Sequence, residues 1–200
     1  MDPRQLKTRA ALVDAIVTLA DTTPLDAITV TALSEAAGIT RDTFYRHAQS
    51  PTDLLASVLS ADLDAILASN SHLPVASANG DSVFRRPTEQ VVAHVAARAP
   101  LYRSAMQPRL DADIRNLLVA YMAAGLAAHL EAHPEIAPLI GGAPPTPAGR
   151  RMLVAYAAAG TVGALEEWLE TGDLTDQHAA VEGILAAAPE WWQLRPTTLG

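Results

Sequence analysis

Apolar side chains recur every three to four residues over most of the chain, which is the period of helices that bury one face. The first such stretch covers residues 4–20. Its apolar stripe consists of Leu6, Leu12, Val13, Ile16, Leu19 and Ala20. The pattern stops in the polar segment 21–28, where Pro24 cannot continue a helix. The sequence therefore begins with one amphipathic helix followed by a loop.

Two short helices and one long helix are predicted next. The first short helix begins at Thr29 and is ended by Gly38, and the second covers Thr40 to about Ala48. The long helix starts near Ser50, a residue type that favours the N-cap, and is followed at once by Pro51, which fits the first helical position.

Helical patterning returns after a segment rich in Asn, Ser, Gly and Pro at 70–87, which we interpret as a loop. The further predicted helices are 88–99, 101–133 with a break near Pro108, 147–171 and 175–188. A Pro- and Gly-rich connector precedes residue 147. No alternating pattern of useful length indicates a strand, so the prediction is an all-α fold of about nine helices.

Composition adds limits to this interpretation. Apolar residues make up 50% of the chain and charged residues 18%, which is typical of a globular protein. No apolar run reaches the length of a membrane span, and the first residues lack the apolar core of a signal peptide. The chain has no cysteine, so disulfides and thiolate metal sites are excluded. We therefore expect a cytoplasmic protein without a membrane partner.

The most informative segment is 29–55, whose two short helices have the spacing of a helix-turn-helix. Two helices that cross steeply need a small residue at the crossing and a residue that tolerates positive φ in the turn. Ser34 and Gly38 occupy these two positions. The expected buried side consists of Val30, Leu33, Ala37, Ile39 and Phe44.

The remaining side chains of the second short helix suit contact with DNA. An arginine can donate two hydrogen bonds to guanine, threonine offers a hydroxyl and a methyl group, and a tyrosine hydroxyl can reach a phosphate. These outward residues are Arg41, Asp42, Thr43, Tyr45 and Arg46. The spacing alone also fits an ordinary structural helix hairpin, so this alternative stays open on the pattern alone.

The fuller string AAGITRDTFYRH, followed by Ser50 and then Asp53, Leu54 and Leu55, resembles the tetracycline-repressor (TetR/AcrR-type) family of regulators. The resemblance covers residues 5–65, and the rest agrees only in its helical character. It implies a three-helix helix-turn-helix DNA-binding domain at 1–50. It also implies a helical ligand-binding and dimerisation bundle at 51–200, with helix 50–70 as the linker.

The resemblance also assigns residues to DNA. Tyr45 and His47 match the family's phosphate-contacting pair, although His47 could equally be a packed structural histidine. Asp42 could accept from cytosine or only favour the helix N-terminus electrostatically. The full set that we assign to DNA contact is Thr29, Thr31, Thr40, Arg41, Asp42, Thr43, Tyr45, Arg46 and His47.

Two departures from the family's usual sequence, together with the charge balance, count against strong DNA binding. Ala48 stands where the family usually has Phe, and Pro51 stands where it usually has a phosphate-binding Lys. The net charge is −8, and residues 1–60 hold five basic against seven acidic side chains. DNA binding must then depend on a few placed cations, and three in the first helix could compensate: Arg4, Lys7 and Arg9. A helical small-molecule-binding protein with weak or lost DNA binding is the alternative.

The C-terminal part offers candidates for a ligand site and a dimer interface. Apolar bulk with a few hydroxyls is typical of small-molecule pockets, and also of ordinary cores. The candidate lining is Tyr102, Met106, Leu118, Tyr121, Met122 and Tyr156. Small residues in helix 147–171 would let a partner helix approach, or would pack within one subunit. The candidate interface, which helix 175–188 would complete, is Ala157, Gly160, Thr161, Ala164, Leu165 and Trp168.

The resemblance implies a homodimer that binds a palindromic double-stranded DNA operator and responds to a small-molecule effector of unknown identity. Repression is the usual outcome in the family. No catalytic constellation or phosphate-binding loop stands out, so we expect neither an enzyme nor a cofactor. His129 and His133 have ligand spacing on one helical face, but without further ligands this pattern is weak and we expect no metal site.

Overall fold

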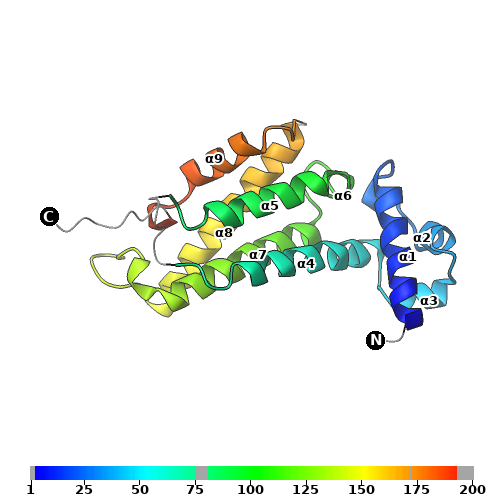
Figure 1. Cartoon of the computed structure of the whole chain (residues 1–200), viewed down its shortest axis with the longest axis horizontal. Helices are drawn as coiled ribbons and strands as arrows, with labels where there is room; N and C mark the ends of the chain where they lie inside the picture. Colours follow the sequence, from blue (N-terminus) through cyan, green and yellow to red (C-terminus); the bar gives the residue numbers. More distant parts are fainter. Residues whose placement is uncertain (1–2, 75–80, 172, 193–200) are drawn as a thin grey trace. The chain divides into compact units, whose positions relative to one another are not determined.

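The computed structural model describes residues 3–74, 81–171 and 173–192, and over these residues the fold is all-helical apart from two isolated β-bridges (Figure 1). The all-α prediction is confirmed. The α-helices are α1 (Pro3–Ala20), α2 (Val30–Ala36), α3 (Arg41–Tyr45), α4 (Pro51–Ser69), α5 (Arg85–Ala97), α6 (Ala99–Ser104), α7 (Ala112–Ala132), α8 (Pro147–Thr171) and α9 (Gln177–Ala187). Short 3-10 turns are η1 (Leu25–Ala27), η2 (Pro134–Ile136) and η3 (Glu190–Trp192).

Helix boundaries differ from the prediction mainly around Pro108. The predicted helix 101–133 is two helices, α6 and α7, separated by the segment 105–111. The Asp111 side chain accepts the backbone N–H of Asp113 at 2.9 Å and so caps the start of α7. The predicted loop 70–87 also ends early, because α5 already begins at Arg85.

The chain divides into two compact units whose boundaries differ from the domain boundaries that we predict from the sequence. The N-terminal unit consists of residues 1–62 together with 98–117, and the C-terminal unit consists of 63–97 together with 118–200. The predicted domains were 1–50 and 51–200. The difference arises because α6 and the first residues of α7 return to the N-terminal unit, which periodicity along the sequence could not show.

In the N-terminal unit, α1 packs against both α2 and α6 (Figure 1). Leu12 and Ile16 of α1 are fully buried, whereas Leu6, which the sequence placed on the same apolar stripe, is half exposed. The buried Tyr102 belongs to this core, and Arg98 forms an ion pair with Asp62 at 2.8 Å. The unit is thus a small helical core that holds α2 and α3 in place.

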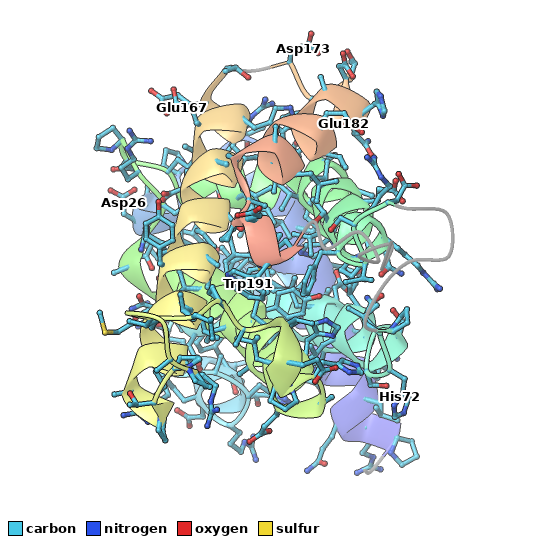
Figure 2. All side chains as sticks on the ribbon, turned by 90° about the vertical axis from the view of Figure 1, so that its left-hand side faces the viewer. Asp26, His72, Glu167, Asp173, Glu182 and Trp191 are labelled. Carbon is cyan, nitrogen blue, oxygen red and sulfur yellow. The ribbon has the colours of Figure 1, made fainter. Side chains whose placement is uncertain are left out.

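In the C-terminal unit, α9 lies along α5 and also contacts α8 (Figure 1). Arg85 of α5 and Glu182 of α9 form an ion pair at 2.5 Å, and this pair raises the pKa of Arg85 and lowers that of Glu182. Figure 2 shows Glu167, Asp173 and Glu182 at the rim, with Trp191 on the inside. Charged groups therefore surround an apolar interior.

None of the helices among the described residues combines the length and apolar character that crossing a lipid bilayer requires.

Candidate functional site

The first short helix, α2, begins and ends as its sequence predicts. The Thr29 hydroxyl accepts the backbone N–H of Ala32 at 3.1 Å, which caps the helix. Gly38 follows the helix with φ +65°, and the N–H of Ile39 reaches the carbonyl of Ser34 at 2.9 Å. Ser34 is buried, and its hydroxyl has no hydrogen-bond partner in the part of the chain that the structure describes. The crossing position therefore needs the small size of serine but does not use its polarity.

The second short helix, α3, is anchored by one buried aromatic ring. The Thr40 hydroxyl accepts the N–H of Thr43 at 3.2 Å and caps the helix. Phe44 is completely buried, whereas the neighbouring Tyr45 is 58% exposed. The predicted helix of residues 40–48 is shorter in the structure, since the helix ends at Tyr45 and the following residues form a turn.

Threonine hydroxyls hold the two arginines of this segment. The Arg41 guanidinium donates to the hydroxyl of Thr31 on α2, and the Arg46 guanidinium donates to the hydroxyl of Thr43 at 3.0 Å. Thr29, Thr40, Arg41, Asp42, Tyr45 and Arg46 are exposed, and Thr31, Thr43 and His47 are half-buried. The nine side chains that we predict to contact DNA are thus exposed or half-buried on the helix-turn-helix.

A basic surface groove joins α1 to the end of α3. Arg4 and Arg9 line it together with Arg46 and His47, and Thr43 completes that side. Two α1 side chains that sequence reasoning missed also line this groove: Gln5 and Thr8. Their signal was available, because residues 4 and 8, and likewise 5 and 9, lie one turn apart on a helix. Lys7 does not line the groove, although the sequence placed it with Arg4 and Arg9.

Side-chain hydrogen bonds, rather than a positively charged residue, stabilise the start of α4. The Ser50 hydroxyl accepts the N–H of Asp53 at 3.0 Å, and the Asp53 carboxylate accepts the N–H of Gln49 at 2.8 Å. Ala48 is buried, so this small side chain occupies the core position where an aromatic ring was expected by resemblance. Pro51 is the first residue of α4.

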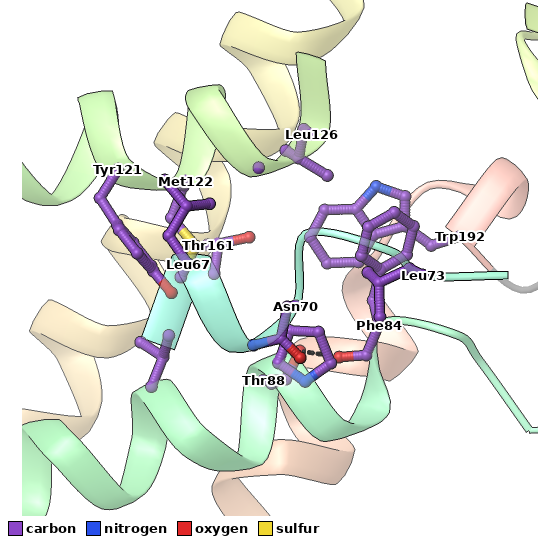
Figure 3. A pocket seen from close by; sticks show the side chains of 13 residues that line it. Leu67, Asn70, Leu73, Phe84, Thr88, Tyr121, Met122, Leu126, Thr161 and Trp192 are labelled. Carbon is purple, nitrogen blue, oxygen red and sulfur yellow. Dashed lines mark hydrogen bonds between the residues drawn. The ribbon is translucent and has the colours of Figure 1, made fainter. Parts of the chain in front are cut away.

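A small apolar cavity of about 60 Å³, partly open to solvent, lies within the C-terminal unit (Figure 3). Its apolar wall includes Leu67, Leu73, Phe84, Val91, Met122 and Leu126. Its polar lining consists of Asn70, Thr88, Tyr121, Thr161 and Trp192, and none of the described residues that line it has a charged side chain. These residues come from α4 and the segment after it, from α5 and the turn before it, and from α7, α8 and the C-terminal 3-10 turn η3, so sequence spacing gave no signal that they converge.

Two of the six predicted ligand-lining residues, Tyr121 and Met122, line this cavity. Tyr102 and Met106 belong to the N-terminal unit, where Tyr102 is fully buried. Leu118 is buried without lining the cavity, and Tyr156 is 78% exposed on α8. These four therefore do not line this cavity, and helical periodicity does not say which positions border an empty space.

The predicted dimer residues fall on two different faces of α8. Ala157, Thr161 and Leu165 are buried within the chain, so the assignment of these three to an interface is corrected. Gly160 is exposed, and Ala164 and Trp168 are half-buried. The exposed face of α8 instead carries Met152 and Tyr156, which lie about two turns and one turn before Gly160, respectively.

The histidine pair formed by His129 of α7 and His133, which follows that helix, lies beside the cavity wall. The rings of His129 and His133 are 4.8 Å apart, and His129 meets Phe84 edge-on at 4.9 Å. Burial, with the neighbouring His133, lowers the pKa of His129. Within the described residues, no group of three or more His, Cys, Asp or Glu side chains is placed to hold a metal ion.

The N-terminal unit thus contains a helix-turn-helix, and the C-terminal unit contains an apolar cavity. No protein-family model and no curated protein sequence matches this chain. Solved structures do match. FadR of Thermus thermophilus, a TetR-family repressor in complex with lauroyl-CoA, is 18% identical with a TM-score of 0.64, covering 96% of this chain and 98% of its own.

Two further structures agree with this fold. The fatty acid degradation regulator FadR of Bacillus halodurans has a TM-score of 0.65 at 16% identity, covering 92% of this chain and 93% of its own. A TetR-family regulator of Streptomyces coelicolor has a TM-score of 0.56 at 16% identity, covering 88% of this chain and 78% of its own. The chain therefore has the fold of TetR-family regulators, as the sequence resemblance implies.

Proposed function

We propose that this chain is a ligand-responsive, DNA-binding transcriptional regulator that acts as a homodimer in the cytoplasm, most simply as a repressor. The observation that carries the proposal is the surface of α3, which presents Arg41, Thr43 and Tyr45. The buried Phe44 of the same helix anchors it to the protein. The TetR-family fold of the whole chain supports the same function.

The DNA-contacting side chains would fall into two groups, those that read base pairs and those that bind phosphates. Arg41 at the first position of α3 suits bidentate donation to guanine in the major groove. The Tyr45 hydroxyl and the basic groove lined by Arg4, Arg9 and Arg46 suit phosphates, which position a protein without reading sequence. Because so few cations are involved, affinity should be modest and the salt dependence shallow.

A dimer would place two copies of α3 in successive major grooves, about 34–36 Å apart for adjacent half-sites. The exposed face of α8 with Met152, Tyr156 and Gly160 is the surface that we assign to the dimer. Small exposed residues of α9, among them Ala179 and Gly183, would complete a bundle of four helices across the twofold axis.

The cavity of the C-terminal unit is our candidate effector site, and α4 is the candidate connection. One continuous helix supplies Leu67 to the cavity and Leu54 and Leu55 to the core of the N-terminal unit. An effector weakens DNA binding by shifting the protein from its DNA-binding conformation to another conformation. The free energy of this shift cannot exceed the difference between the effector's binding free energies for the two conformations. The proposal therefore expects the effector to shift α4.

The direct test is selection of bound sequences from a random double-stranded oligonucleotide pool by the purified full-length chain. We expect enrichment of an inverted repeat, with two half-sites of equal sequence, at low salt. The matched control is the same selection with Arg41→Ala, Tyr45→Phe. Absence of enrichment by the unmodified chain would contradict DNA reading and favour a small-molecule-binding protein that kept only the fold.

A further inference from the structure

One buried titratable side chain of the C-terminal unit has no part in the proposed function. His129 of α7 is buried, and its Nε2 atom has no hydrogen-bond partner among the described residues. Its ring meets that of Phe84 edge-on at 4.9 Å and lies 4.8 Å from that of His133. These surroundings suit a neutral imidazole, because a buried charge without hydration or a counter-charge is costly.

Phe84 connects His129 to the 3-10 turn η3. The Phe84 ring lies 4.8 Å from that of Trp192 and meets that of Trp191 edge-on at 6.2 Å, and both tryptophans are buried. We call Phe84, His129, Trp191 and Trp192 the aromatic cluster. Phe84 and Trp192 of this cluster also line the cavity (Figure 3). His129 therefore packs on a ring that is itself part of the cavity wall.

Hydrogen bonds join the segment before α5 to η3 without using His129. The Ser82 hydroxyl donates to the backbone carbonyl of Trp192 at 2.5 Å, and it accepts the backbone N–H of Phe84 at 3.2 Å. Together with the stacking of the Phe84 and Trp192 rings, these contacts link the two segments to each other. We therefore expect both segments to move away from α7 jointly when the contact with His129 is lost.

Two titratable groups of the described residues act on His129, and both follow it in the sequence. Burial lowers the pKa of His129 most, and the neighbouring His133 lowers it further, whereas Glu135 opposes them. The Glu135 carboxylate is largely exposed and lies 3.8 Å from Nδ1 of His133, so it compensates little for a charge on the buried ring. Phe84, which packs on His129 from outside α7, brings no titratable group. His129 is therefore neutral near pH 7 and gains a proton in mild acid.

We propose that protonation of His129 controls the cavity wall. When the imidazole is neutral, Phe84 packs on it and the aromatic cluster stays closed. When the imidazole is charged, its ring needs water, so it leaves Phe84, and the segment before α5 separates from α7 together with η3. Acid thus opens this end of the C-terminal unit while its helices persist. The inference goes beyond the proposed function and does not require DNA binding.

The test is NMR of the ¹⁵N- and ¹³C-labelled full-length protein between about pH 8 and about pH 5. The ring signal of His129 reports its protonation, and each indole N–H signal reports the surroundings of one tryptophan and its exchange with water. Trp168 of α8 lies outside the aromatic cluster and is the internal reference. The variant His129→Leu removes the titrating group, and His178→Gln, which changes an exposed histidine of α9, is the matched control.

We expect the indole signals of Trp191 and Trp192 to shift with the same midpoint pH as the ring signal of His129, and to lose their protection against exchange in the acid state. The Trp168 signal should stay in place. In His129→Leu the two cluster signals should not move over this range, because no proton is taken up beside Phe84, whereas His178→Gln should keep the full titration. Circular dichroism should show that helix content is kept at the acid end.

Four results would each overturn the inference. They are titration of His129 with unchanged Trp191 and Trp192 signals, no proton uptake by His129 above about pH 5, the same tryptophan shifts in His129→Leu, and a loss of helix content with the same midpoint. The comparison of midpoints in the unmodified chain decides the question even if His129→Leu does not fold. Any of these results together with an enriched DNA site would leave the regulator proposal intact. The expected titration without an enriched site would instead contradict the regulator proposal and keep the inference.

Discussion

The guanidinium of Arg41 donates a hydrogen bond to the hydroxyl of Thr31, which links the first residue of α3 to α2. The side chain that is best suited to read guanine is thus held by a neighbouring residue in the free protein. A held arginine loses less conformational freedom on binding than a mobile one. This hydrogen bond is the basis of our first prediction.

Replacement of Arg41 by Ala should relax sequence specificity more than it lowers overall affinity. We expect a cost of about 1–3 kcal/mol on the selected operator and little change on random DNA, because alanine cannot hydrogen-bond to a base. Binding is measured by fluorescence anisotropy on both DNAs at one salt concentration. Arg151→Ala, an exposed arginine of α8, is the control. An equal decrease in affinity for both DNAs would assign Arg41 to phosphate instead.

The double substitution Arg4→Gln, Arg9→Gln should lower overall DNA affinity and leave sequence specificity unchanged. These residues line the basic groove beside Arg46, and phosphate contacts carry no sequence information. We expect weaker binding to all sequences and a decrease in the slope of log K against log salt of about 0.9 for each phosphate that is no longer neutralised. Lys7→Gln, outside the groove, should change the slope less. An unchanged slope in the double variant would show that the groove does not touch DNA.

Substitution of Ser34 tests the crossing of α2 and α3. The hydroxyl is buried without a partner, so Ser34→Ala should raise the free energy of unfolding, by about 1 kcal/mol. Ser34→Leu should lower it by about 1–3 kcal/mol, because the crossing has no room for the larger side chain. Urea unfolding measures both. Destabilisation by alanine would mean that the hydroxyl has a partner, such as an ordered water.

Gly160→Val tests the proposed dimer surface without disturbing the monomer. Gly160 is exposed, and a Cβ added there meets nothing within 4 Å. We therefore expect an intact helical fold by circular dichroism and a loss of dimer by sedimentation equilibrium, since a bulky side chain blocks close helix approach. Ala120→Val, at an exposed position of α7, should leave the dimer unchanged. A dimer in Gly160→Val would place the interface elsewhere.

Stability should fall in mild acid because of His129. Its pKa is lowered in the folded state, chiefly by burial and then by His133. A folded pKa below the unfolded value of about 6.5 means that the unfolded state binds more protons as pH falls through this range. Folding free energy is therefore lost below about pH 6.5, and the loss levels off below the folded pKa.

The variant His129→Leu should flatten this dependence, with the melting temperature falling less between about pH 7 and pH 5 than in the unmodified chain. His72→Gln, which changes an exposed histidine, is the control and should keep the original slope. Thermal melts in matched buffers measure both. The same acid-dependent loss in His129→Leu as in the unmodified protein would assign it to other groups.

The starts of the helix-turn-helix helices and the turn between them could be predicted from the sequence alone. Thr29, Gly38 and Thr40 set the ends of α2 and α3 through caps and a positive φ, which are interactions among residues close in the chain. For the same reason Ser50 and Pro51 fixed the start of α4. Resemblance in this segment also predicted the fold of the whole chain.

Which buried positions border a cavity, and which helix faces are free, depends on packing in three dimensions. Leu67, Phe84 and Trp192 meet at one cavity although they are far apart in sequence, and periodicity treats a cavity-lining residue and a packed core residue alike. Likewise the small residues of α8 suggested an interface, but Ala157 and Thr161 face the chain's own core and Gly160 faces outward. Packing between segments that are distant in the sequence determines which face of α8 is buried, and no local sequence pattern indicates that face.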